Sequence, residues 1–105
     1  MIISSTPEIP GKRTVEVLGI ARGSTVRARN VGRDIIASLK GLVGGEISEY
    51  TRLLADARES ALNRLIADAE RMGADAVVNV RFTTSAVMQG AAEILAYGTA
   101  IKTES

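Results

Sequence analysis

Between residues 46 and 72, apolar side chains recur at intervals of three or four residues, the spacing of one face of an α-helix. The stripe consists of Ile47, Tyr50, Leu54, Ala57, Ala61, Leu65, Ala69 and Met72. The opposite side carries charged pairs four residues apart, among them Arg64 and Asp68. Because no proline or glycine interrupts the stretch and Gly73 follows it, the pattern predicts one long amphipathic helix.

Three other stretches predict β-strands, because their β-branched and apolar residues alternate with polar ones. They span residues 12–29, 74–84 and 93–102. In the first, Val15, Val17 and Ala21 are expected on one side and Leu18 and Ile20 on the other. Gly19 and Gly23 suggest bends or bulges within it.

The remaining segments are shorter. Residues 30–43 predict a second helix, and Gly32 and Gly41 make it irregular. Residues 1–11 hold both prolines and predict an extended arm, with a strand at residues 2–4. We interpret residues 1–105 as one domain.

These elements predict an α+β fold with two layers and the chain order β-α-β-β. The long helix returns the chain to its starting end, so the strands before and after it run in the same direction. The last strand follows a short linker, pairs antiparallel, and fits best between the other two, giving the sheet order 1-3-2. The long helix and the short irregular helix complete the subunit.

One long helix covers only one face of such a sheet. The other face is expected to carry Leu18, Ile20, Val77, Leu95, Tyr97 and Ile101. An apolar face of this size is larger than monomers usually expose to water. We therefore predict that another copy of the same chain covers it, so the protein is a homo-oligomer.

The amino-acid composition excludes several kinds of catalytic and metal site. The chain has no cysteine and no histidine, which excludes disulfides, thiol nucleophiles, Ser-His-Asp triads and the usual zinc ligands. The net charge is +1 and aromatic residues make up 3%, so neither membrane nor nucleic acid is a favoured partner. No signal peptide or membrane span is recognisable, and we expect a cytoplasmic protein.

Three segments carry a family resemblance. GIARGSTVRARNVGRDIIASLKGLVGGEISEYTRLLADARESAL, GADAVVNVRF and AEILAYGTAI resemble, in this order, the YbjQ-like family. The match covers residues 6–102. That family has no known function and carries a heavy-metal-binding label. The resemblance implies a dodecin-like subunit with a 1-3-2 sheet, assembled as a ring of five.

The heavy-metal label fits the residues poorly, since such metals prefer thiolate, thioether or imidazole ligands. The chain offers only Met1, Met72 and Met88. Glu46 and Glu49 leave a hard-cation site open, although carboxylates are also favoured at a helix start. We expect no cofactor, and metal binding stays an alternative.

Basic residues concentrate in the first part of the chain. Residues 1–45 hold seven basic and three acidic residues, whereas residues 46–105 hold six and nine. The run comprises Arg22, Arg27, Arg29, Arg33 and Lys40. Repeated around a ring, Arg27, Arg29 and Arg33 with Asn30 predict an anion-binding mouth. Alternatively, these arginines pair with the acidic helix.

Asn79 and Arg81 are expected on one strand face with Asp75 and Thr83, and Tyr97 on the next strand can point its hydroxyl there. These residues predict a polar lining where sheets of neighbouring subunits meet, or of a central channel. The alternative is a satisfied hydrogen-bond network at the interface. Together these features favour a non-enzymatic homo-oligomer that binds a small anionic ligand at subunit boundaries. The alternatives are a purely structural or protein-interaction ring, and metal-ion binding.

Overall fold

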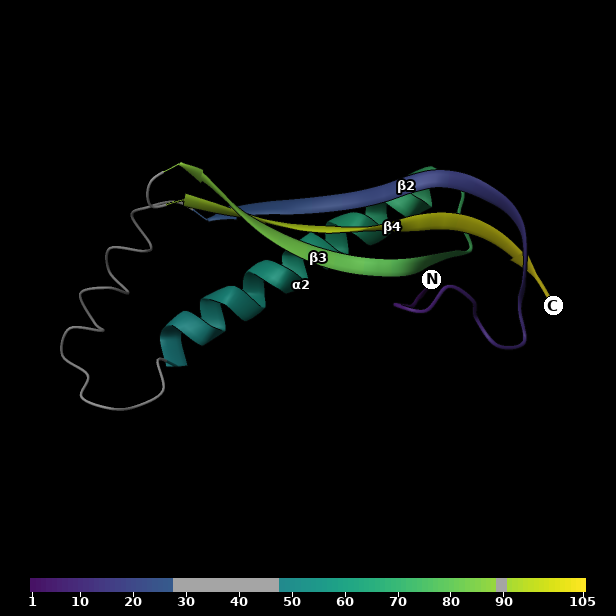
Figure 1. Ribbon diagram of the computed structural model, residues 1–105, viewed down its shortest axis with the longest axis horizontal. Helices are drawn as coiled ribbons and strands as arrows, with labels where there is room; N and C mark the ends of the chain where they lie inside the picture. Colours follow the sequence, from purple (N-terminus) through teal and green to yellow (C-terminus); the bar gives the residue numbers. More distant parts are fainter. Residues whose placement is uncertain (28–47, 89–90) are drawn as a thin grey trace.

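The computed structural model describes residues 1–27, 48–88 and 91–105. Its elements are β1 (Ile2–Ile3), β2 (Arg13–Arg27), α2 (Ser48–Arg71), β3 (Ala76–Met88) and β4 (Ala91–Glu104) (Figure 1). The long helix and the three long strands confirm the predicted elements. The helix predicted over residues 30–43 lies outside the described residues.

The strands form one sheet in the order β1-β3-β4-β2. β4 pairs antiparallel with both β2 and β3, so the three long strands have the predicted order. β1 pairs parallel with β3 and makes the sheet mixed. The arm extends this pairing beyond β1, since Asn79 donates its N–H to the Thr6 carbonyl over 3.1 Å and Val80 donates to the Ser4 carbonyl over 3.0 Å.

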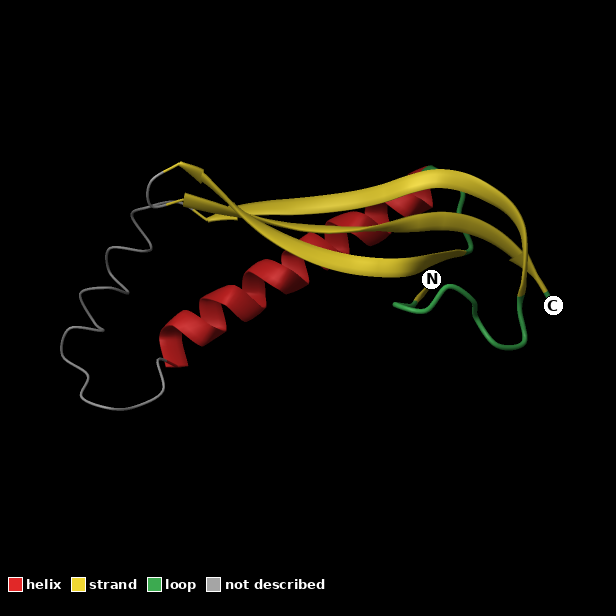
Figure 2. Ribbon diagram, in the orientation of Figure 1, coloured by secondary structure: helices red, strands yellow, loops and turns green. Residues whose placement is uncertain are grey.

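α2 covers one face of the sheet and lies mainly against β2 and β4 (Figure 2). The helix contributes its predicted stripe to a core of small side chains. The buried members are Ala57, Ala61, Leu65 and Ala69 of the helix and Ala21, Val77, Ile94, Ala96 and Ala100 of the sheet. Because so many of them are alanines, the helix backbone lies close to the sheet backbone.

At Gly23 the backbones of the two layers lie very close together. A Cβ atom built on Gly23 would lie 2.3 Å from the Leu65 nitrogen and 2.4 Å from the Ala61 oxygen. Real Cβ atoms do not approach backbone this closely, so only glycine fits here. Gly23 therefore determines how deeply α2 packs onto β2.

The sheet face away from α2, here called the outer face, differs in part from the prediction. Leu95, Tyr97 and Ile101 lie on it, opposite the buried Ile94, Ala96 and Ala100 of the same strand. Ile20 also lies there, since its register partner is Thr99.

Two residues predicted for the outer face lie on the helix side instead. Leu18 packs against the helix-side core, and Val77 is fully buried in it. The register of β2 shifts between Val17 and Gly19, and that of β3 shifts at Asn79, whose φ is 53°. Each extra residue reverses the alternation between the side chains before the shift and those after it, so Leu18 does not share a face with Ile20, and Val77 does not share one with Arg81. The predicted faces were therefore wrong at these two positions, although a bulge at Gly19 was expected.

The N-terminal arm covers one end of the outer face. Ile9 packs against Ala76, Val78 and Ile101, and Ile101 keeps only 2% of its surface exposed. Beyond the arm the face stays open, with Ile20 67% and Tyr97 38% exposed. The N-terminal arm of the same chain thus buries part of the face that we predicted another copy would cover.

Candidate functional site

The free edge of β2 is closed by side chains of α2. β2 is the last strand of the sheet, so alternate backbone groups along it point away from β4. Asp68 accepts the backbone N–H of Arg22 at 3.0 Å, and Arg64 donates to the carbonyl oxygen of Ser24. Arg64 and Asp68 are four residues apart on the helix, which corresponds to a rise of about 6 Å. This is close to the length of two strand residues, so the two side chains reach backbone groups two residues apart on β2.

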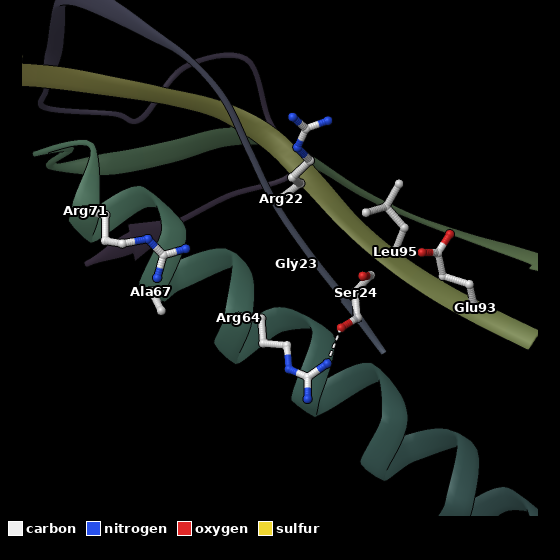
Figure 3. Close-up of a pocket in the computed structure, with 8 residues that line it drawn as sticks. All are labelled: Arg22, Gly23, Ser24, Arg64, Ala67, Arg71, Glu93 and Leu95. Carbon is white, nitrogen blue, oxygen red and sulfur yellow. Dashed lines mark hydrogen bonds between the residues drawn. The ribbon is translucent and has the colours of Figure 1, made fainter. Parts of the chain in front are cut away.

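A cavity of about 550 Å³ opens beside these caps (Figure 3). Its polar walls are formed by Arg22 and Ser24 of β2, Arg64 and Arg71 of α2, and Glu93 of β4. Gly23, Ala67 and Leu95 supply its apolar surface. Two elements distant in sequence, β2 and α2, therefore bring three arginines to one cavity at the free edge of the sheet. The Arg22 side chain lies on the outer face, because Gly23 next to it faces α2, whereas Arg64 and Arg71 lie on the helix.

The three guanidinium groups differ in how far they are engaged. Arg71 donates to Asp68 over 3.0 Å. Arg64 uses one nitrogen for the Ser24 carbonyl and retains further N–H donors. The Arg22 guanidinium makes no ion pair with any residue that the structure describes. Guanidinium groups bind phosphate and carboxylate through paired hydrogen bonds, so this cavity can hold a small anion.

Asp68 is held in its charged form by the same contacts. The hydrogen bond from the Arg22 backbone lowers the pKa of the Asp68 carboxyl, and Arg71 lowers it further by a hydrogen bond and by its charge. Partial burial opposes these effects, but the net pKa lies below the ordinary value. The charged carboxylate therefore stabilises the folded state.

Asp68→Asn is expected to make the free energy of unfolding depend less on pH in the acidic range. The folded pKa is lowered, so the stabilisation is present above the unfolded value of about 3.9 and is lost as pH falls through the folded pKa. Urea unfolding at pH 7, 5, 4 and 3 should show wild type more stable at pH 7 and the difference shrinking below pH 4. Glu70→Gln, at an exposed position of the same helix, should keep the wild-type slope; an Asp68→Asn slope equal to wild type would contradict the prediction.

Of the predicted site residues, Arg81 and Tyr97 are brought together. They are register partners on the outer face, and Arg22 is the partner of Tyr97 on its other side. The Arg81 side chain donates to the carbonyl oxygens of Ser5, at 2.8 Å, and Val80, at 2.9 Å. Arg81 thus fastens the N-terminal arm.

Asn79 is not aligned with Arg81 and Tyr97 on the outer face. It occupies the shift between the paired residues Val78 and Arg81, so it does not share their regular alternation as predicted. Its backbone N–H bonds the arm, and its left-handed conformation is one that asparagine tolerates better than most residues.

Most residues of the predicted anion-binding mouth are not among those that the structure describes. Arg29, Asn30 and Arg33 lie outside the described residues, and Arg27 is the last residue of β2. Their proposed role stays a prediction.

Sequence reasoning missed most of the observed cavity. Arg22 belonged to the basic run but was not selected, and Arg71 and Glu93 were not considered. Arg64 and Asp68 were expected to pair with each other; instead Arg64 bonds Ser24, and Asp68 pairs with Arg71. Arg64 and Asp68 lie on the helix side that was expected to face water. A small residue such as Gly23 beside Arg22 was the only available signal of a close helix contact.

Within the described residues, no cluster of three or more acidic residues, histidines or cysteines is placed to hold a metal ion. Glu46 lies outside those residues. No helix in the described part of the chain has the length and apolar character needed to cross a membrane.

Fold and cavity together define a small α+β protein in which one helix packs on a mixed sheet and closes its edge with charged side chains. The chain belongs to the YbjQ family, whose model, described as "Putative heavy-metal-binding", matches residues 1–104. A UPF0145 protein of Methanosarcina acetivorans is 61% identical over 97% of this chain and 96% of its own length. One from Methanoculleus marisnigri is 63% identical over 97% and 95%.

A solved structure has the same fold. It is a protein of unknown function from Pediococcus pentosaceus that belongs to the DUF74 family, with a TM-score of 0.66. The similarity covers 99% of this chain and 98% of that one at 13% sequence identity, so it bears on the fold alone.

Proposed function

We propose that this protein is a non-enzymatic, self-associating module that binds a small anionic ligand in the cavity at the free edge of β2. The observation that carries the proposal is the gathering of Arg22, Arg64 and Arg71 around one cavity. The Arg22 guanidinium has no ion-pair partner among the described residues, so it is available to a ligand. Since the chain has no histidine or cysteine, binding is favoured over catalysis.

Self-association is supported by the outer face. Val17, Ile20, Val26 and Tyr97 remain between 38% and 67% exposed there. Burying such side chains is favourable by roughly 25 cal/mol per Å² of apolar surface. The opposite net charges of the two parts of the chain also favour contacts between copies. A ring of five, as the family resemblance implies, is our proposed assembly.

Arg22→Ala is expected to weaken binding of inorganic phosphate about tenfold or more, because a hydrogen bond to a charged group contributes about 1.5–3 kcal/mol. Calorimetric titration gives the affinity, and the thermal shift at fixed phosphate provides a second readout, since a ligand stabilises the state that it binds.

Arg58→Ala is the matched control, because Arg58 is exposed on α2 outside the cavity lining. It should leave phosphate affinity unchanged and report any general effect of removing a positive charge. If Arg22→Ala binds as tightly as Arg58→Ala, the anion does not occupy this cavity. If wild type shows no titration with phosphate, sulfate or citrate, the remaining function is that of a structural ring.

A further inference from the structure

The two edges of the sheet are protected to different extents. On β2, Asp68 and Arg64 of α2 bind backbone groups that point outward, which blocks that edge against another strand. On β3, the N-terminal arm follows the strand only as far as Val80, which donates to the Ser4 carbonyl oxygen (Figure 1). Over residues 82–86, no residue that the structure describes pairs with β3 on the side away from β4.

Three residues of this open edge direct their backbone N–H and C=O groups away from the sheet. The Val80 N–H points at the arm, away from β4. Because backbone groups alternate in direction along a strand, those of Phe82, Thr84 and Ala86 point the same way. Such a row of unpaired donors and acceptors is a template on which another strand can pair.

The side chains of the open edge do not oppose such pairing. Residues 82–86 read FTTSA, with no charge and no proline, whereas natural edge strands are commonly protected by charged side chains or proline. All five residues are exposed. Two copies of this segment brought together meet no like charge, so the edge is compatible with itself.

An apolar surface lies beside the open edge on the helix side. Phe82 is on that side, because its register partner Ala96 belongs to the buried core. α2 lies mainly against β2 and β4, so the phenyl ring stays 47% exposed. Leu62 and Ile66 each follow a buried helix residue by one position, whereas the residues that close the β2 edge precede one. The flank of α2 away from the β2 edge is therefore apolar.

We propose that residues 82–86 of β3 pair with the same residues of a second copy, antiparallel about a two-fold axis at Thr84. In this register Thr84 is opposite the partner's Thr84, and Phe82 is opposite the partner's Ala86. All the outward backbone groups then find partners, a large side chain faces a small one, and two threonines meet, which is a favourable pair. A longer register is excluded because the arm occupies the edge at Val80.

This surface is separate from the outer face and from the anion cavity, so the inference goes beyond the proposed function. Stable complexes bury about 1,200–2,000 Å², and five paired residues with two phenyl rings stay below that range. The dissociation constant is therefore expected on the order of 10–100 μM. Dilute protein shows the assembly that the outer face forms, and concentrated protein shows twice that number of chains.

Sedimentation velocity on the full chain, from roughly tenfold below to tenfold above this range, should show the wild-type mass doubling. Thr84→Lys and Thr84→Glu each place like charges opposite one another at the two-fold axis, so neither variant alone should double. An equimolar mixture of the two should regain the doubling, because unlike charges then meet. Ala55→Lys and Ala55→Glu, at an exposed position of α2, should each double as wild type does.

Amide hydrogen exchange identifies the backbone groups that pair. The N–H groups of Phe82, Thr84 and Ala86 should exchange rapidly in dilute wild type and slowly in concentrated wild type. Those of Thr83 and Ser85 point toward β4 and should exchange slowly at both concentrations. Slow exchange at Thr84 in dilute protein would show that the same chain or a ring neighbour covers the edge, which would overturn the proposal.

The outcomes separate this inference from the proposed function. A wild-type mass that does not double, a doubling that survives both Thr84 substitutions, or a mixture that fails to regain it would overturn the two-fold pairing. None of these results bears on the ring or on anion binding. If the ring fails and the edge pairing holds, the mass rises from one chain to two.

Discussion

Replacing Gly23 with alanine is expected to lower the melting temperature by roughly 12 °C or more. The added methyl group would lie within 2.6 Å of three backbone atoms of α2, which no side-chain rotation can relieve. Overpacking of this kind costs about 3 kcal/mol, and each kcal/mol moves the midpoint of a domain this size by about 4 °C or more. Thermal unfolding followed by circular dichroism, at fixed protein concentration, measures the change.

Gly11→Ala separates steric overlap from the ordinary cost of replacing a glycine. A Cβ atom at Gly11 meets nothing within 4 Å, although its φ of 81° disfavours other residues. The strain there should cost about 1 kcal/mol. A Gly23→Ala variant no less stable than Gly11→Ala would show that the helix does not lie directly on β2. Because Gly23 also lines the cavity, Gly23→Ala should lose phosphate binding as well.

If the protein self-associates as proposed, Ile20→Asp is expected to leave it as single chains. Ile20 is 67% exposed on the outer face, so the aspartate would stay hydrated in a free subunit. In an assembly that covers this face, the carboxylate would be buried without a partner, at a cost of several kcal/mol for each subunit. Native mass spectrometry should show a ring for wild type and one chain for Ile20→Asp, with unchanged circular dichroism.

Ala55→Asp provides the control, because it adds the same charge at an exposed position of α2. It should retain the mass of wild type. A wild-type protein that stays a single folded chain at high concentration, or an Ile20→Asp variant with an undiminished mass, would remove the proposed use of the outer face.

The helix was predictable because burial imposes a period on the sequence. Ala57, Ala61 and Leu65 recur at the spacing that aligns them on one side, and the structure buries all three. The strand order followed from the length of this helix and the short linker after β3.

Strand faces were less predictable, because one bulge reverses every later position. The shifts at Gly19 and Asn79 each break the alternation, so Leu18 lies on the helix side although Ile20 lies on the outer face, and Val77 lies on the helix side although Arg81 lies on the outer face. A glycine in a strand suggests a bulge but does not show where pairing resumes.

By itself the sequence determined the two layers, the strand order and the absence of thiol and imidazole chemistry, because these depend on periodicity and composition. Only the tertiary structure decided which charges meet. Arg22, Arg71 and Glu93 are far apart along the chain, and they share a cavity because the contact at Gly23 brings α2 against the edge of β2. Such a meeting leaves no local pattern, since it depends on how two elements pack rather than on how either one forms.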